Sequence, residues 1–530
     1  MHPIWCIDEI LNVILSYVDP PHTDRSSRAP VKPTGRNTFA VLARTCKTFS
    51  DPALDALWEF PKSILPLLQI LPTFGKLEDG KYGILSPILP EHWARFQFYA
   101  SRIQFLEYGT SSDRDNAFPH VFESLAKVKG DGPLLPNLQR IVWKPYRTIG
   151  PELMVLMTPT LKDANICPFR YIGSIDCPDG KQVEGVGTLE LASILDSLSS
   201  SALALEHLTM EGSLTSSSTS SITRFRHLRT LDLGSCGAWS SSDTFHGLAS
   251  LERLAELKIN TDKLNVNSTG STSSFRSLQS LHISGTPPSI RSVFCIISST
   301  QLRSIVIGGN YSYYPDEWRP CFHTLQSRYH NSLTHFRMNL VLGCLSMTRE
   351  SENIMEIIRP LLDVSILQVV VLNLEGHLRV DDADIASMAH AWQNLRHLHL
   401  WCHKSGNGPS LESLTSCAAM CPHLHQLELP IDASKPSSTS DDRMKRDMTQ
   451  DPSEPSPGVV SNAMRSIEFL GNVGITDPDW VASRIRSLFP QLRYFEAHSW
   501  DPSMAKMWDQ VRRLIPARRK VRQRQRQRIY

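Results

Sequence analysis

The sequence predicts a mixed α/β protein in which a short N-terminal helical domain precedes a long solenoid of strand–helix repeats. Two observations predict this fold. An apolar pattern, with side chains at positions 1, 4 and 6 of a short segment, recurs through most of the 530 residues. Residues 7–58 carry apolar side chains at helical spacing.

The repeated pattern is clearest in FRHLRTLDLGSC, where Leu228, Leu231 and Leu233 occupy positions 1, 4 and 6. The first four intervals after Leu205 are 23 to 26 residues long, and the next four are 28 to 34 residues long. The eleven copies are Leu205/Leu208/Met210, Leu228/Leu231/Leu233, Leu254/Leu257/Ile259, Leu278/Leu281/Ile283, Leu302/Ile305/Ile307, Leu333/Phe336/Met338, Leu367/Val370/Leu372, Leu395/Leu398/Leu400, Leu424/Leu427/Leu429, Met464/Ile467/Phe469 and Leu492/Phe495/Ala497.

Such repeats are stable only when they stack. Positions 4 and 6 place two apolar side chains on one face of a strand, and one unit cannot bury that face alone. The first four intervals are typical of leucine-rich repeats, whose period is roughly 20–29 residues, and the wider later ones are typical of repeats whose convex side carries a full helix. We therefore expect a leucine-rich-repeat solenoid with parallel strands on its concave face and helices on its convex face.

Three earlier copies of the pattern, a segment almost free of apolar side chains and a final helix set the expected domain boundaries. Ile103/Leu106/Tyr108, Leu138/Ile141/Trp143 and Leu161/Ala164/Ile166 begin the pattern. We expect a helical linker at 61–100 and the solenoid at 101–500. Residues 433–458 carry almost no apolar side chains and are predicted to be a disordered insert. A capping helix over Pro502–Leu514 is predicted to begin the last segment, 501–530.

Three amphipathic stretches predict the N-terminal helices. We expect helices over residues 7–18 and 39–46, separated by a loop at 20–38, and a third helix that starts at Ser50-Asp51-Pro52. Residues 215–221 are predicted to be a Ser/Thr-rich loop. The apolar positions of the three helices are Ile10, Leu11, Ile14, Tyr17 and Val18; Phe39, Leu42, Ala43 and Cys46; and Leu54, Leu57 and Trp58.

The N-terminal segments are Ile7-Asp-Glu-Ile-Leu11, Ile14-Leu-Ser-Tyr-Val18, Leu42-Ala-Arg-Thr-Cys-Lys-Thr-Phe49 and Pro52-Ala-Leu-Asp-Ala-Leu-Trp58. Together with the repeats they resemble the F-box that opens many fungal, basidiomycete-type F-box/leucine-rich-repeat proteins. Two features depart from the family pattern. Asp8 stands where an F-box usually has a proline before the glutamate, and the loop at 20–38 is unusually long.

The resemblance implies a substrate-recognition adaptor of a Skp–cullin–F-box E3 ubiquitin ligase. The F-box would dock on a Skp-family linker protein, and through it on a cullin–RING ligase, while the repeats bind an unknown protein substrate. The alternative is a leucine-rich-repeat binding scaffold whose degenerate F-box joins no ligase. The implied linker-binding residues are Ile7, Ile10, Leu11, Ile14, Leu42, Cys46, Leu54 and Trp58. A separate interpretation is that these eight side chains only fill a three-helix core.

The repeats also predict a substrate-binding surface. Side chains at positions 3 and 5 flank the buried residue at position 4, so they point onto the concave face. Cationic, aliphatic, imidazole and carboxylate groups are mixed most densely between positions 335 and 428. The expected substrate-binding residues are His335, Arg337, Val369, Val371, His397, His399, Gln426 and Glu428.

Composition and motifs argue against catalysis, metal binding and membrane insertion. The sequence holds no GxGxxG, P-loop, GxSxG or HExxH motif, so we expect no catalytic residues, no cofactor and no enzyme activity. His397, His399, Cys417 and Cys421 lie close in sequence, but strand and helix positions are not expected to converge on zinc. Scattered cysteines and the absence of a signal-like start favour the cytoplasm or nucleus, with no membrane partner.

The last 15 residues, PARRKVRQRQRQRIY, form a basic tail with seven Lys or Arg and no acid. This composition is typical of a nuclear-localisation signal or a contact with RNA or an acidic surface, and equally of a solvated tail. Because the net charge of the whole chain is only +2, nucleic acid is not the expected partner.

Overall fold

A computed structural model describes residues 11, 13–15, 17, 35–61, 63–77, 82–108, 119–144, 152–167, 186–212, 214, 216–236, 242–262, 274–309, 315–341, 352–375, 378–402, 408–434, 460–471, 474–497, 499 and 501–515. The chain divides into two compact units, Met1–Leu254 and Ala255–Tyr530. The division falls within the range expected to be one solenoid. Among the described helices, none has the length and apolarity needed to cross a membrane.

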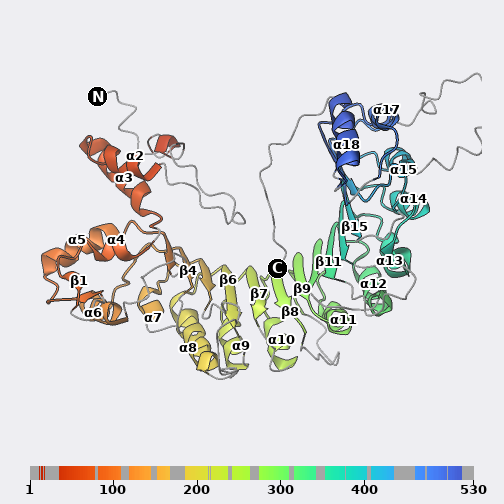
Figure 1. Ribbon diagram of the computed structural model, residues 1–530. Helices are drawn as coiled ribbons and strands as arrows, with labels where there is room; N and C mark the ends of the chain where they lie inside the picture. Colours follow the sequence, from red (N-terminus) through yellow and green to blue (C-terminus); the bar gives the residue numbers. More distant parts are fainter. Residues whose placement is uncertain are drawn as a thin grey trace, which may run out of the picture. The chain divides into compact units, whose positions relative to one another are not determined.

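The first unit opens with helices and one hairpin (Figure 1). Strands β1 and β2 pair in antiparallel fashion, and their aromatic rings Phe74 and Tyr82 stack 5.4 Å apart. The segment expected to be a helical linker thus also contains a hairpin. The elements before the main sheet are α2 (Gly35–Leu42), α3 (Lys47–Trp58), α4 (Leu65–Leu68), β1 (Phe74–Lys76), β2 (Tyr82–Ile84) and α5 (Pro90–Ala100).

Five described strands of the first unit then pair in parallel, in chain order. They are β3 (Phe105–Tyr108), β4 (Arg140–Trp143), β5 (Asp163–Ile166), β6 (His207–Gly212) and β7 (Thr230–Cys236). The helices that connect or follow them are α6 (Pro119–Lys129), α7 (Glu152–Leu156), α8 (Val186–Ser201), α9 (Ser216–Ile222) and α10 (Ser242–Leu248).

The second unit repeats this arrangement with nine described parallel strands, again in chain order. They are β8 (Glu256–Asn260), β9 (Ser280–Ser284), β10 (Ser304–Gly309), β11 (His335–Val341), β13 (Val369–Glu375), β15 (His397–Cys402), β16 (Gln426–Leu429), β17 (Ser466–Phe469) and β18 (Tyr494–Ala497). The two short strands β12 (Glu352–Asn353) and β14 (Leu378–Arg379) pair separately.

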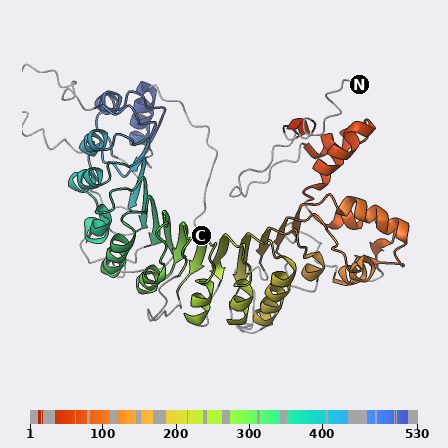
Figure 2. The ribbon, with the colours of Figure 1, turned by 180° about the vertical axis from the view of Figure 1, so that it is seen from behind.

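The helices of the second unit lie along one face of its strands, as both ribbon views show (Figures 1 and 2). They are α11 (Pro287–Ile296), α12 (Pro315–Tyr329), α13 (Met355–Leu362), α14 (Asp382–Ala391), α15 (Glu412–Met420), α17 (Pro478–Leu488) and α18 (Pro502–Leu514). The bounds of α18 are those expected of the capping helix. The prediction of a mixed α/β fold with parallel strands is therefore confirmed.

One backbone contact fixes the register of these strands. The carbonyl at position 2 accepts hydrogen bonds from the N–H groups at positions 2 and 3 of the next repeat. For example, Gln279 O accepts from Arg303 N at 2.9 Å and from Ser304 N at 3.0 Å. The side chains at position 4 consequently align, as in the pairing of Leu281 with Ile305. We call such a pair of hydrogen bonds to one carbonyl a rung.

Three local expectations were wrong. Helix α3 begins at Lys47 rather than at Ser50, so Pro52 lies inside it. Residues 35–38, expected at the end of a loop, belong to α2. The segment expected to be a Ser/Thr-rich loop forms α9. In α9, Ser218 and Thr219 are buried, and burial on the sheet stabilises a helix whose own sequence does not favour one.

The final helix offers a test of how the last strands are stabilised. The buried ring of Trp508 packs on Phe469 and Phe495, with centroids 5.6 and 6.2 Å away. Replacing Trp508 with Ala should leave a cavity and destabilise this end by about 3–5 kcal/mol. We expect the amides of β17 and β18 to exchange hydrogen much faster, whereas the exposed Lys506→Ala control should not change them. Unchanged protection in the Trp508 variant would contradict this account.

Candidate functional site

The residues expected to bind a linker protein occupy different environments. Ile7 and Ile10 lie outside the described residues. Leu11 is fully buried, whereas Ile14 is 39% exposed. Leu42, Cys46, Leu54 and Trp58 are half-buried, and the Trp58 ring lies 4.9 Å from the Tyr99 ring of α5. Leu11 therefore fills local core in this structure, and Trp58 packs against the next part of the chain.

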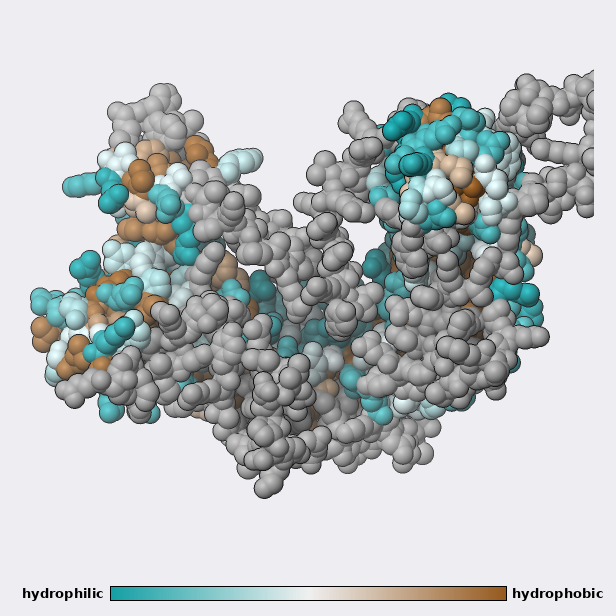
Figure 3. All heavy atoms as spheres, in the orientation of Figure 1, coloured by the Kyte–Doolittle hydropathy of each residue, from teal (hydrophilic) through white to brown (hydrophobic). Residues whose placement is uncertain are grey.

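Other apolar side chains near these positions are more exposed than the expected ones. Val13, Tyr17 and Val41 are exposed by 56%, 83% and 57%. Apolar residues are visible on the surface over the first helices in Figure 3. Helical spacing alone did not single out Val41, because the apolar face assigned to its helix used Phe39 and Leu42 instead.

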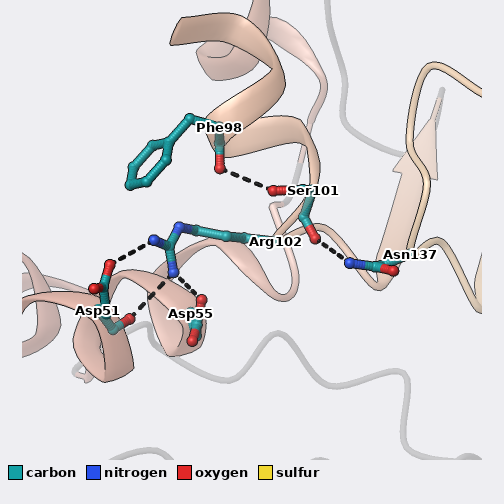
Figure 4. Close-up of polar contacts among 6 residues, drawn as sticks. All are labelled: Asp51, Asp55, Phe98, Ser101, Arg102 and Asn137. Carbon is teal, nitrogen blue, oxygen red and sulfur yellow. Dashed lines mark hydrogen bonds and ion pairs between the residues drawn. The ribbon is translucent and has the colours of Figure 1, made fainter. Parts of the chain in front are cut away.

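Arg102 joins α3 to the segment after α5 (Figure 4). Its guanidinium donates to Asp51 Oδ1 at 2.6 Å, to the Asp51 carbonyl at 3.3 Å and to the Asp55 carboxylate. The Phe98 ring lies 4.4 Å from the same guanidinium. Asp51 was expected to start a helix, but in mid-helix its carboxylate binds Arg102 instead. Only 11% of the Arg102 side chain is exposed.

A rung connects the same helix to the main sheet. Glu59 O, at the end of α3, accepts hydrogen bonds from Gln104 N at 3.1 Å and Phe105 N at 3.0 Å. Within each unit, successive strands receive the same contact from the repeat before them. Phe60 stacks on Phe105 with centroids 4.1 Å apart. We call Asp51, Asp55, Glu59, Phe60 and Arg102 the joint, because together they attach α3 to β3.

The expected substrate-binding residues lie at the predicted strand positions, but their exposure differs. His335 and Arg337 are exposed, and Val369 and Gln426 are half-buried. Val371 is only 8% exposed, so the expectation that it is open to a partner was wrong. His397, His399 and Glu428 retain 22%, 17% and 15% of their side-chain exposure. These three side chains are held against the sheet rather than projecting freely.

His399 and Glu428 belong to a hydrogen-bonded network across four strands. His399 Nδ1 contacts the Glu428 carboxylate, and His399 Nε2 lies 2.5 Å from Asn373 Oδ1. Asn373 Nδ2 donates in turn to Asn339 Oδ1 at 2.7 Å. Both ring nitrogens of His399 therefore face side-chain oxygens. The two asparagines follow position 6, outside the predicted motif, which is why sequence reasoning missed them.

Neighbouring groups shift the pKa of Glu428, at one end of this network, and of His335, on the strand at its other end. Burial alone raises the pKa of Glu428, but the His397 and His399 imidazoles and the Gln426 amide together lower it well below its ordinary value. His397 Nε2 lies 3.5 Å from Glu428, an ion-pair distance. Burial, followed by the charges of Arg337 and Arg396, lowers the pKa of His335. Cations therefore crowd one end, and carboxylate–imidazole pairing stabilises the other.

The nearby cysteines are poor metal ligands. Burial raises the pKa of Cys421 to about 11, and burial and Cys421 raise that of Cys417, so both remain protonated thiols. His423 and His425 are exposed, and His403 lies outside the described residues. In the part of the chain that the structure describes, no group of three or more His, Cys, Asp or Glu side chains could hold a metal ion.

Comparison with known proteins adds no assignment. No family model matches the chain, and no curated protein matches it.

The joint predicts a local effect of losing Arg102. We expect Arg102→Ala to destabilise the packing of α3, because its hydrogen bonds to Asp51 and Asp55 are lost. The effect should be only about 1–2 kcal/mol, since the two exposed aspartates stay hydrated without their partner. Hydrogen exchange should accelerate in α3. The matched control is Arg95→Ala, an exposed arginine of α5. Equal exchange in the two variants would show that Arg102 does not hold this helix.

Glu428 predicts a pH-dependent contribution to stability. Because its folded pKa is lowered, its stabilisation is present above the ordinary pKa of 4.5 and is lost as pH falls below it. At pH 7, Glu428→Gln should lower the free energy of unfolding by about 2–3 kcal/mol. The difference from wild type, measured by urea denaturation, should shrink as pH falls below 4.5. Glu256→Gln, an exposed glutamate of β8, should show no such dependence.

Proposed function

We propose that the protein is a non-catalytic binding adaptor that recruits a protein substrate to a Skp–cullin–F-box ubiquitin ligase. The observation that carries the proposal is the register of the strands. Equivalent side chains from successive repeats lie side by side, so one face presents a continuous row of polar and aliphatic groups, including His335, Arg337 and Val369. Extended rows of this kind suit recognition of another chain rather than of a small molecule.

The N-terminal helices supply the second contact in this proposal. Ile14, Tyr17, Val13 and Val41 are exposed apolar side chains, and a linker protein would cover them. The F-box resemblance of residues 7–60 supports the same assignment. The joint then explains how a docked linker is coupled to the first strand, because α3 contacts β3 through Arg102, Glu59 and Phe60.

A scaffold outside any ligase is the alternative, and burial of Leu11 favours it. A family docking residue that is fully buried cannot contact a linker unless its helix moves. The two proposals share the strand face as a protein-binding surface. They differ only in whether the exposed apolar residues capture a linker protein.

Linker capture should be tested with point variants of the full chain. Deleting residues 1–60 would also remove the Glu59 rung and the Phe60 stack, so a deletion cannot separate docking from folding. We expect Ile14→Asp combined with Val41→Asp to weaken capture of the host's Skp-family linker about tenfold or more. A pull-down from purified components provides the measurement.

Val460→Asp is the matched control, because Val460 is 48% exposed and lies in the second unit. It should leave capture unchanged. If wild-type protein with a cooperative unfolding transition captures no linker, the ligase assignment is wrong and the scaffold alternative stands. If the double variant captures linker as well as wild type, the docking residues are wrong.

A further inference from the structure

Three cationic side chains lie near one another on the strand face of the second unit. His335 and Arg337 occupy positions 3 and 5 of β11, and Arg396 occupies position 2 of the repeat that contains β15. All three are exposed. Both arginines act electrostatically on the His335 ring, although β13 lies between β11 and β15. We call His335, Arg337 and Arg396 the cationic cluster.

Among the side chains that the structure describes, no carboxylate pairs with this cluster. Arg337 and Arg396 take part in none of the ion pairs found there, whereas Arg319 on α12 and Arg484 on α17 each pair with a glutamate. The flanking strands carry uncharged residues at positions 3 and 5, namely Ser304 and Val306 on β10 and Val369 and Val371 on β13. An anionic group of a partner would therefore meet positive charge that its neighbours do not compensate.

One contact orients the His335 ring. Thr334 Oγ1 lies 2.9 Å from His335 Nδ1, and the same hydroxyl donates to Arg303 O at 3.2 Å. Nε2 is consequently the ring nitrogen available to a partner. When the ring is protonated both nitrogens carry hydrogen, so Nε2 can donate to an anion while Nδ1 keeps its contact with Thr334.

The spacing of the cluster suits several carboxylates better than one compact anion. Residues follow one another at ~3.3 Å along a strand, and neighbouring strands lie ~4.8 Å apart. The Cα atoms of His335 and Arg337 are therefore roughly 7 Å apart, and those of Arg337 and Arg396 roughly 14 Å apart. Alternate side chains of an extended chain point to one side and are also ~7 Å apart. Acidic side chains at alternate positions of an extended segment match these separations.

We propose that the cationic cluster binds an acidic segment of a partner protein, with glutamate or aspartate at alternate positions, and that binding takes up a proton at His335. This inference deepens the proposed function and rests on one part of it, namely that the strand face binds protein. It does not depend on linker capture.

The charges around His335 explain the proton uptake. Burial, followed by the charges of Arg337 and Arg396, lowers the pKa of His335 below its ordinary value of 6.5, so the neutral ring predominates at pH 7. The other groups at its own and the neighbouring repeats are Arg303, Thr334, Gln368 and His397, and Glu428 on β16 is held by His397 and His399. Carboxylates of a bound partner would raise this pKa, so affinity should increase as pH falls through about 6.5.

Synthetic peptides on the full chain provide the test. The first probe is Glu-Ser-Glu-Ser-Glu-Ser-Glu, and the second has glutamine in place of each glutamate. The third is the glutamine peptide with its central serine phosphorylated. Fluorescence anisotropy at low ionic strength measures their affinities. We expect the glutamate peptide to bind about tenfold tighter than the other two, and its affinity to rise about three- to tenfold from about pH 7.5 to about pH 5.5.

Substitutions assign the binding to the cluster. Arg337→Gln and Arg396→Gln should each weaken binding of the glutamate peptide about fivefold or more. His335→Gln should change the affinity little at the higher pH and remove most of the rise at the lower pH. Arg359→Gln on α13 and His390→Gln on α14, both exposed on the helical side, should behave like wild type. Thermal unfolding of each variant establishes that it is folded.

The inference is wrong if the glutamate peptide binds no tighter than the glutamine peptide, or if both arginine variants bind it like wild type. Tighter binding of the phosphopeptide would overturn it as well, because the cluster would then take a single phosphate group. A rise in affinity at low pH that survives in His335→Gln would contradict proton uptake at that ring.

Linker capture is measured separately on the same protein. Failure of the peptides with successful capture removes only this inference. Peptide binding by a chain that captures no linker removes only the ligase assignment.

Discussion

The rung is the contact on which the rest of the structure depends. Within each unit, the carbonyl at position 2 accepts two N–H groups from the next repeat, and this sets the register of one strand on its neighbour. A shift of one residue would turn every apolar side chain at positions 4 and 6 out of the core. The burial of those side chains and the rung therefore support the same alignment. The positions of all side chains on the opposite face follow from it.

The strands could be predicted because their signal is repeated, and the helices were harder because theirs is local. All fourteen copies of the 1-4-6 pattern coincide with strands. Helix α9 escaped prediction because serine and threonine favour caps and turns in isolation, yet here Ser218 and Thr219 pack in the interior. The sequence Ser50-Asp51-Pro52 predicts a helix start that the structure does not have. The Asp51 carboxylate binds Arg102, 51 positions away, instead of capping a helix.

Contacts between strands limited prediction of the candidate site. The sequence places His399 and Glu428 on the predicted face, but it does not reveal that they contact each other and so are largely withdrawn from solvent. Asn339 and Asn373 belong to the same network only because β11 and β13 continue beyond position 6. Arg337 projects from the same face with no such contact. The face thus combines a rigid, internally satisfied part with a part whose hydrogen-bonding groups remain available.

The Glu59 rung has a consequence for self-association. The outermost strand of a sheet exposes backbone groups that can pair with another molecule, and natural proteins cover or interrupt such edges. At β3 this cover is the end of α3, whose carbonyl occupies Gln104 N and Phe105 N while Phe60 shields the ring of Phe105. The helical domain therefore also protects the margin of the sheet. A chain without α3, Glu59 and Phe60 would expose a parallel edge ready to pair with a second copy.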